Sequence, residues 1–146
     1  MTDDPISSGS GTAEDPWQLR TPPLSSQYTL HRDTRDGVEV LVCTVGKTVL
    51  LYDARCIEDL HVMLCERGDW VELGSADEQK DAKPGTVEAW GRADDNPVGG
   101  WYGLKKGLRG RFAMYIPPLL KHLGLAEVEH HARGNRMRAI DRPGAS

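Results

Sequence analysis

The chain has 146 residues, of which 38% are hydrophobic and 27% are charged, and its formal net charge at neutral pH is −4. This length fits one domain with tails, and the composition is typical of a soluble globular protein. No apolar run reaches the roughly 20 residues that a helix needs to cross a bilayer. The sequence therefore predicts no membrane partner.

The first 16 residues are polar and rich in Gly, Ser and Asp, which predicts a disordered tail. One α+β domain is expected over residues 17–141, with a second disordered tail over residues 142–146. The acidic start, which lacks an apolar stretch, does not match a secretory signal. Three cysteines (Cys43, Cys56 and Cys65) form no even disulfide framework, which favours a reducing, cytoplasmic location.

Three segments rich in β-branched residues predict antiparallel strands at residues 28–32, 38–45 and 48–52. Only a Gly-Lys pair separates the last two segments, a spacing typical of a tight hairpin. The Gly-Lys-Thr at this turn is not a phosphate-binding P-loop, because Leu41 stands where that motif needs its first glycine.

A helix follows, which Asp53 is expected to cap and Gly68 to end. Its apolar spacing predicts a buried stripe made by Ile57, Leu60, His61 and Leu64.

The rest of the chain predicts short elements: a strand or turn at residues 70–73, a loop at 75–83 and a helix over 84–90. A residue before proline should avoid the α region, so the double proline at 117–118 separates residues 111–115 from a helix ending at Gly124. A hairpin around an Arg-Gly-Asn turn closes the domain. The predicted order is an N-terminal antiparallel sheet, then helices, then a C-terminal hairpin. This order indicates an α+β fold with winged-helix-like order.

Charge is distributed unevenly, since residues 1–95 carry −10 and residues 96–146 carry +6. This asymmetry indicates either an anionic partner for the C-terminal part or two halves that attract each other across the fold. Residues 99–111, called the basic loop below, hold five glycines, four cations and no acidic residue, which predicts contact with nucleic acid or a small anion. The expected contacts are Lys105, Lys106, Arg109 and Arg111, with Arg133, Arg136 and Arg138 on the hairpin.

Two rings in the basic loop, Trp101 and Tyr102, are expected either to stack on a base or to anchor the loop on the core. Residues 107–110 have the GxxG spacing of KH domains, but Lys106 replaces the isoleucine of that motif. Backbone N–H groups opened by glycines could also cradle a phosphate or carboxylate. The acidic residues 77–78 and 94–95 are expected on the solvated surface, or as a shield over the basic loop until a partner displaces it.

No catalytic residue, cofactor or metal site is predicted. His61 and Cys65 lie one helical turn apart, but a zinc site needs four ligands and only the distant histidines 130 and 131 could add to them. Cys43 and Cys65 are expected to be small buried hydrophobic residues. Cys56 is the thiol that a helix N-terminus could activate.

The chain resembles a family of small uncharacterised bacterial proteins of the actinobacterial type in the motifs GDWVELGSADEQK, GTVEAWGR and NPVGGWYGLKKGLRGRFAMYIPPLL. The resemblance covers residues 11–140 and implies no activity. The leading hypothesis is a non-enzymatic α+β domain that contacts nucleic acid. The alternatives are a binder of, or an enzyme acting on, a small phosphorylated or carboxylated metabolite, and a protein-interaction module whose acidic and basic halves pair between chains.

Overall fold

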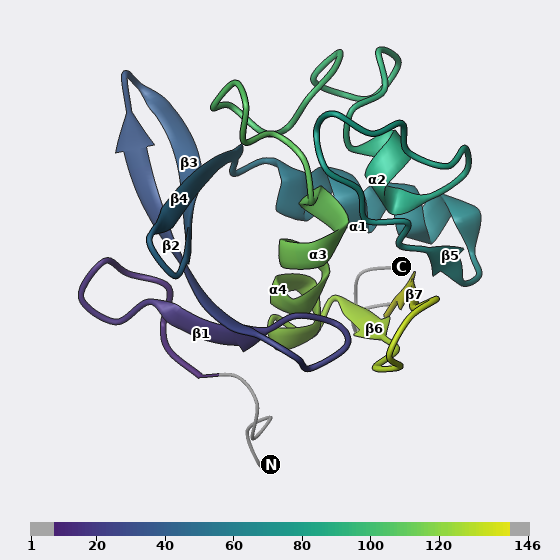
Figure 1. The fold of residues 1–146 in the computed structure, drawn as a ribbon, viewed down its shortest axis with the longest axis horizontal. Helices are drawn as coiled ribbons and strands as arrows, with labels where there is room; N and C mark the ends of the chain where they lie inside the picture. Colours follow the sequence, from purple (N-terminus) through teal and green to yellow (C-terminus); the bar gives the residue numbers. More distant parts are fainter. Residues whose placement is uncertain (1–7, 141–146) are drawn as a thin grey trace.

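A computed structural model describes residues 8–140 of the chain, so the tails expected at residues 1–7 and 142–146 lie outside the described part. Figure 1 shows a curved sheet, a pair of short helices in the middle and a small sheet near the C-terminus. The strands are β1 (Trp17–Arg20), β2 (Gln27–Arg35), β3 (Val38–Val45), β4 (Thr48–Asp53), β5 (Val71–Glu72), β6 (Ala126–Val128) and β7 (Arg136–Ala139). The helices are α1 (Cys56–Arg67), α2 (Val87–Trp90), α3 (Phe112–Tyr115) and α4 (Pro117–His122).

The larger sheet is antiparallel, with strand order β1-β2-β3-β4. The predicted tight hairpin between β3 and β4 is confirmed: Val45 pairs with Thr48, and Gly46 adopts a φ of 60° in the turn. Strand β1, which was not predicted from the sequence, pairs with β2 through Trp17 and Leu30. It was missed because four residues directly after a proline give too short a pattern to recognise.

Hydrogen-bonded structure begins before Trp17, inside the segment expected to be a tail. Ser8 and Gln18 exchange backbone hydrogen bonds of 3.1 and 2.7 Å, which extends the sheet beyond β1. Gly11 packs against the indole of Trp17, since a Cβ at this glycine would lie 2.4 Å from the ring. The backbone N–H of Arg32 donates to the Gly11 carbonyl at 2.9 Å. Residues 8–16 are therefore held against β1 and β2.

Helix α1 begins later than predicted, at Cys56, and Asp53 does not cap it. The carboxylate of Asp53 accepts from the N–H of Arg55 at 3.1 Å instead, because β4 continues through Asp53. Gly68 ends the helix as predicted, in the left-handed conformation. His61 is half-buried rather than part of the stripe, which consists of Cys56, Ile57, Leu60, Met63 and Leu64.

Helices α3 and α4 lie end to end between the curved sheet and the C-terminal sheet (Figure 1). They are separate helices, as predicted, although Ile116 keeps helical φ and ψ angles (−87° and −40°) before Pro117. Two buried tyrosines of the sheet fix this region: Tyr28 donates to the carbonyl of Tyr115 at 2.6 Å, and Tyr52 donates to that of Gly110 at 2.9 Å. The polar ends of these rings are thereby satisfied inside the core.

The smaller sheet has the order β5-β7-β6, and its β6–β7 pair is the predicted C-terminal hairpin. The segment 70–73, expected as either a strand or a turn, supplies strand β5, in which Val71 pairs with Met137. The fold class is therefore α+β, with an N-terminal antiparallel sheet, helices and a C-terminal hairpin. Among residues 8–140, none of the helices has both the length and the apolar character required to span a bilayer.

Candidate functional site

The basic loop lies along the outer edge of β4. Gly103 forms a β-bridge with Tyr52, and the N–H of Leu104 donates to the Leu51 carbonyl at 2.8 Å. The loop also folds back on itself, because a Cβ at Gly103 would lie 2.6 Å from the Cα of Arg109. Glycine is required at this position by the close approach of two backbone segments. The loop is thus fixed to the domain rather than projecting freely from it.

The anion-binding groups of the basic loop hold a carboxylate of the same chain. Glu78 accepts from the backbone N–H groups of Gly107 (3.1 Å) and Arg109 (2.8 Å). The guanidinium of Arg109 adds two hydrogen bonds of 3.0 and 3.2 Å to the same carboxylate. Arg109 in this way lowers the pKa of Glu78 from its ordinary 4.5 to about 2. Two backbone N–H groups of the glycine-rich segment thus converge on one carboxylate, that of Glu78.

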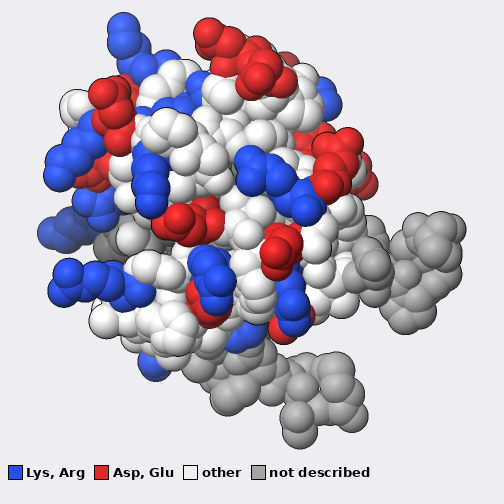
Figure 2. Space-filling model, turned by 90° about the vertical axis from the view of Figure 1, so that its right-hand side faces the viewer, with Lys and Arg blue, Asp and Glu red and all other residues white. Residues whose placement is uncertain are grey.

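Three other cations proposed for ligand binding also pair with carboxylates. Arg111 pairs with Asp77, so residues 77 and 78 both pair with the basic loop, which agrees with the alternative that they shield it. On the hairpin, arginines 136 and 138 pair with Glu129 and Glu127. Figure 2 shows cationic and anionic side chains alternating over the face that carries α2 and β5, with no continuous basic patch. Lys105, Lys106 and Arg133 are exposed and have no ion-pair partner among residues 8–140.

The two rings of the basic loop have different surroundings. Tyr102 is fully buried, stacks on Trp90 and Phe112 with centroid distances of 5.1 and 5.5 Å, and donates to Asp59 at 2.8 Å. It anchors the loop to the core and presents no face to a ligand. Trp101 is half-buried, and the guanidinium groups of Arg92 and Arg109 each lie 4.4 Å from its ring centroid.

A buried ion pair holds the acidic segment in position. Glu88 is fully buried, and its carboxylate accepts from Arg92 at 2.7 Å and from the N–H of Ala113 at 2.9 Å. The same guanidinium donates to the carbonyls of Lys80 and Ala76. This network was not predicted from the sequence. The i, i+4 spacing of Glu88 and Arg92 is nevertheless typical of an ion pair on a helix.

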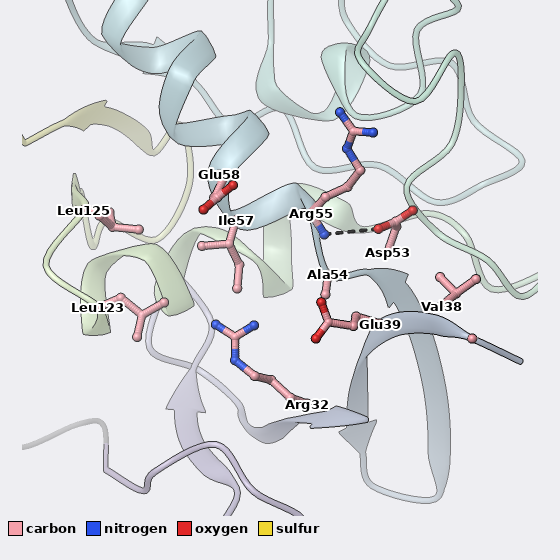
Figure 3. A pocket seen from close by; sticks show the side chains of 11 residues that line it. Arg32, Val38, Glu39, Asp53, Ala54, Arg55, Ile57, Glu58, Leu123 and Leu125 are labelled. Carbon is pink, nitrogen blue, oxygen red and sulfur yellow. Dashed lines mark hydrogen bonds between the residues drawn. The ribbon is translucent and has the colours of Figure 1, made fainter. Parts of the chain in front are cut away.

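A second region of charge is an open cleft of about 710 Å³ between the β2–β3 end of the larger sheet, the start of α1 and the end of α4. It is called the β2–α1 cleft below. Figure 3 shows Arg32 from β2 and Glu39 from β3 reaching toward the first turn of α1, which carries Glu58. The cleft is lined by Arg32, Gly37, Val38, Glu39, Asp53, Ala54, Arg55, Ile57, Glu58, Leu123 and Leu125.

Alternation along the strands explains why two charged side chains enter this cleft. Tyr28 and Leu30 point into the core, so Arg32 lies on the same face of β2. On β3, Glu39 likewise shares the face of Leu41. Charged residues on the inward face of a sheet are unusual, since that face is normally apolar. Here they lie beyond the covered part of the sheet, at the border of the cleft.

Arg32 is positioned by Trp17, since its guanidinium carbon lies 5.5 Å from the indole centroid. Within residues 8–140, the side chains of Arg32, Glu39 and Glu58 have no hydrogen-bond or ion-pair partner. The remaining charged lining residues have partners: Asp53 accepts from the backbone of Arg55, whose guanidinium pairs with Asp59 on α1. The cleft thus contains one cation and two carboxylates that no side chain in the described part of the chain neutralises.

The cysteines and histidines give no further site. Burial raises the pKa of the Cys56 thiol well above its ordinary value, so α1 does not activate it. Cys65 is exposed rather than buried, with its sulfur 3.7 Å from Nε2 of His61. Among residues 8–140, no group of three or more His, Cys, Asp and Glu side chains is arranged to hold a metal ion.

Comparison with known proteins identifies one related group. Residues 9–140 match the model of a protein family described as "Family of unknown function (DUF6855)". No curated protein and no solved structure gives a match. The actinobacterial type suggested by the motifs stays a prediction. Since the match covers most of the chain, the protein belongs to this family of unknown function.

Proposed function

We propose that the protein is a binding domain for a small carboxylate-bearing molecule, which the β2–α1 cleft holds through Arg32. The observation that carries this proposal is an inward-facing arginine, oriented by Trp17 and without a carboxylate partner within residues 8–140. A planar guanidinium forms two parallel hydrogen bonds to a carboxylate, which makes arginine well suited to this class of ligand.

The size and lining of the cleft support a small organic ligand. A volume of about 710 Å³ lies in the range of small-molecule sites. Leu123, which is half-buried, offers apolar surface beside the charged groups. Three free cysteines support a reducing, cytoplasmic setting for this binding domain.

Substitution of Arg32 tests the proposal. A panel of small carboxylates is screened by thermal shift, because a ligand that binds only the folded state raises its melting temperature. For each binder, titration calorimetry compares the wild type with Arg32→Met and with Arg67→Met, a control at an exposed arginine outside the cleft.

We expect Arg32→Met to weaken binding at least about tenfold, since charge-assisted hydrogen bonds are lost. Arg67→Met should leave the affinity unchanged. If no carboxylate shifts the melting temperature, or if the two variants bind equally well, the proposal is wrong.

A second candidate function, nucleic-acid contact, is supported by three exposed cations without ion-pair partners in the described part of the chain: Lys105, Lys106 and Arg133. It has fewer available charges than the sequence indicated, because arginines 109, 111, 136 and 138 already pair with carboxylates. The pairs made by Arg109 and Arg111 join the basic and acidic halves within one chain, which leaves less charge for pairing between chains.

A further inference from the structure

The unpaired carboxylates of the β2–α1 cleft, Glu39 and Glu58, restrict the class of ligand further than Arg32 alone does. We infer that the ligand is a zwitterion of the short-peptide type, with a free ammonium group, a free carboxylate and an apolar side chain. This inference rests on the proposed function and extends it. Arg32 contacts the carboxylate, Glu39 and Glu58 contact the ammonium group, and the apolar side chain lies on Leu123.

The charge balance of the lining excludes an anion as a good fit. The charged lining residues comprise two arginines and three carboxylates, and one of those arginines, Arg55, pairs with Asp59. A phosphate or dicarboxylate held by Arg32 would therefore lie near Glu39 and Glu58 with no second cation to offset them. Repulsion between a bound anion and these two carboxylates would disfavour binding.

A purely cationic ligand fits no better. An amine near the carboxylates would lie close to the guanidinium of Arg32, a like charge that no group of such a ligand offsets. A ligand with both charges satisfies both groups at once. Arg32 and Glu39 lie on the same face of the neighbouring strands β2 and β3, and Glu58 lies on α1, so both charge signs border one space (Figure 3).

The apolar part of the lining defines the third feature of the ligand. Leu123, at the end of α4, is half-buried and provides more of the accessible apolar surface than Ile57 and Leu125, which are each only 6% exposed. Covering such a surface with an aliphatic side chain contributes roughly 25 cal/mol for each Å² of apolar area removed from water. The cleft volume of about 710 Å³ matches a peptide-sized molecule.

The basic loop gives a useful contrast, because its oxyanion site is already filled. Glu78 accepts hydrogen bonds from four donor groups there, so a free carboxylate would have to displace it. The β2–α1 cleft requires no such displacement. A zwitterion added to the protein should therefore bind at the cleft and leave the hydrogen bonds of Glu78 intact.

The experiment compares three probes that differ only at their ends: leucyl-leucine, N-acetyl-leucyl-leucine and leucyl-leucinamide. Titration calorimetry measures their affinities for the full chain. Leucyl-leucine should bind at least about tenfold more tightly than either blocked form, because each blocked form lacks one charge-assisted interaction. These measurements use the wild type and do not depend on the folding of a variant.

Substitutions in the cleft test which charged side chain contacts each end of leucyl-leucine. The double variant Glu39→Gln/Glu58→Gln should weaken leucyl-leucine at least about tenfold and should not weaken N-acetyl-leucyl-leucine. Arg32→Met should weaken leucyl-leucine and leave leucyl-leucinamide unchanged. Glu66→Gln, an exposed glutamate of α1 outside the cleft, serves as the matched control and should bind like the wild type.

The outcomes separate this inference from the proposed function. If N-acetyl-leucyl-leucine binds as tightly as leucyl-leucine, the zwitterion inference is overturned while carboxylate binding by Arg32 stands. If leucyl-leucinamide binds as tightly as leucyl-leucine, both are overturned, because the carboxylate then contributes nothing. Absence of binding by all three probes overturns the short-peptide assignment, and the wider carboxylate panel still decides the proposed function.

Discussion

The basic loop and the β2–α1 cleft use the same kinds of charged side chain in opposite ways. In the loop, Arg109 and Arg111 meet Glu78 and Asp77, so the charges stabilise the position of a long segment. In the cleft, Arg32 faces carboxylates that lie beyond ion-pair distance. A dense cluster of cations in a sequence therefore does not by itself mark a binding site. The proposed site lies instead where charges have no partner among the described residues.

The largest expected effect comes from breaking the buried pair beneath the loop. Arg92→Met leaves the fully buried carboxylate of Glu88 without its cation, so the free energy of unfolding should fall by about 3–5 kcal/mol. Urea unfolding, followed by circular dichroism, measures the midpoint and the slope. The control is Arg55→Met, which removes a more exposed pair with Asp59 and should change the midpoint little. Equal midpoints for both variants would contradict a structural role for Arg92.

A smaller, pH-dependent effect is expected at Glu78. Its pKa in the folded protein is about 2, below the ordinary 4.5, so the ionised carboxylate stabilises the folded state at pH values above 4.5. That stabilisation is lost as the pH falls from 4.5 toward 2. Glu78→Gln should therefore be less stable than the wild type at pH 7, and the difference should shrink through this window.

Unfolding midpoints measured across that pH window test the Glu78 prediction. The matched control is Glu58→Gln in the cleft, where the carboxylate has no partner among residues 8–140. Its stability should stay within about 0.5 kcal/mol of the wild type. If the difference in unfolding midpoint between wild type and Glu78→Gln does not change with pH, the ionised carboxylate of Glu78 does not stabilise the loop. The contrast drawn between the basic loop and the β2–α1 cleft would then be wrong.

The smallest effect is expected at the exposed lysines of the loop. If they contact nucleic acid, Lys105→Ala/Lys106→Ala should weaken the retention of labelled duplex DNA and reduce its log–log salt dependence by about 0.9 for each phosphate that is no longer neutralised. The control is Lys47→Ala, at the exposed turn between β3 and β4. No retention of DNA by the wild type at low salt would remove nucleic-acid contact from consideration.

The sequence predicted those parts of the fold that local rules determine. The strands at 38–45 and 48–52 follow from β-branched residues around a Gly-Lys turn, and Gly68 ended α1 as expected. Strand β1 was missed because its pattern is short. The prediction that Asp53 caps α1 was wrong, because β4 continues through this residue. Its carboxylate accepts a hydrogen bond from the backbone N–H of Arg55 instead.

The charge pairings could not be predicted in the same way, because they join distant segments. Glu78 and Arg109 are 31 positions apart, and only the folded chain brings them together. For the cleft, a usable signal existed: the alternation of Tyr28, Leu30 and Arg32 already placed a charged residue on the core-facing side of a strand. Under the proposed function, such an inward charge is the sequence signal that locates the ligand site.

Both outer strands of the larger sheet are partly covered. Ser8 forms a β-bridge with Gln18 at the outer edge of β1, and Gly103 forms one with Tyr52 at the outer edge of β4. Exposed strand edges are templates on which other chains can add, and they are a common origin of aggregation. By laying its own backbone along both margins, this protein hinders a neighbouring molecule from continuing the sheet. Deleting the segment before Trp17 should therefore make the protein more prone to self-association.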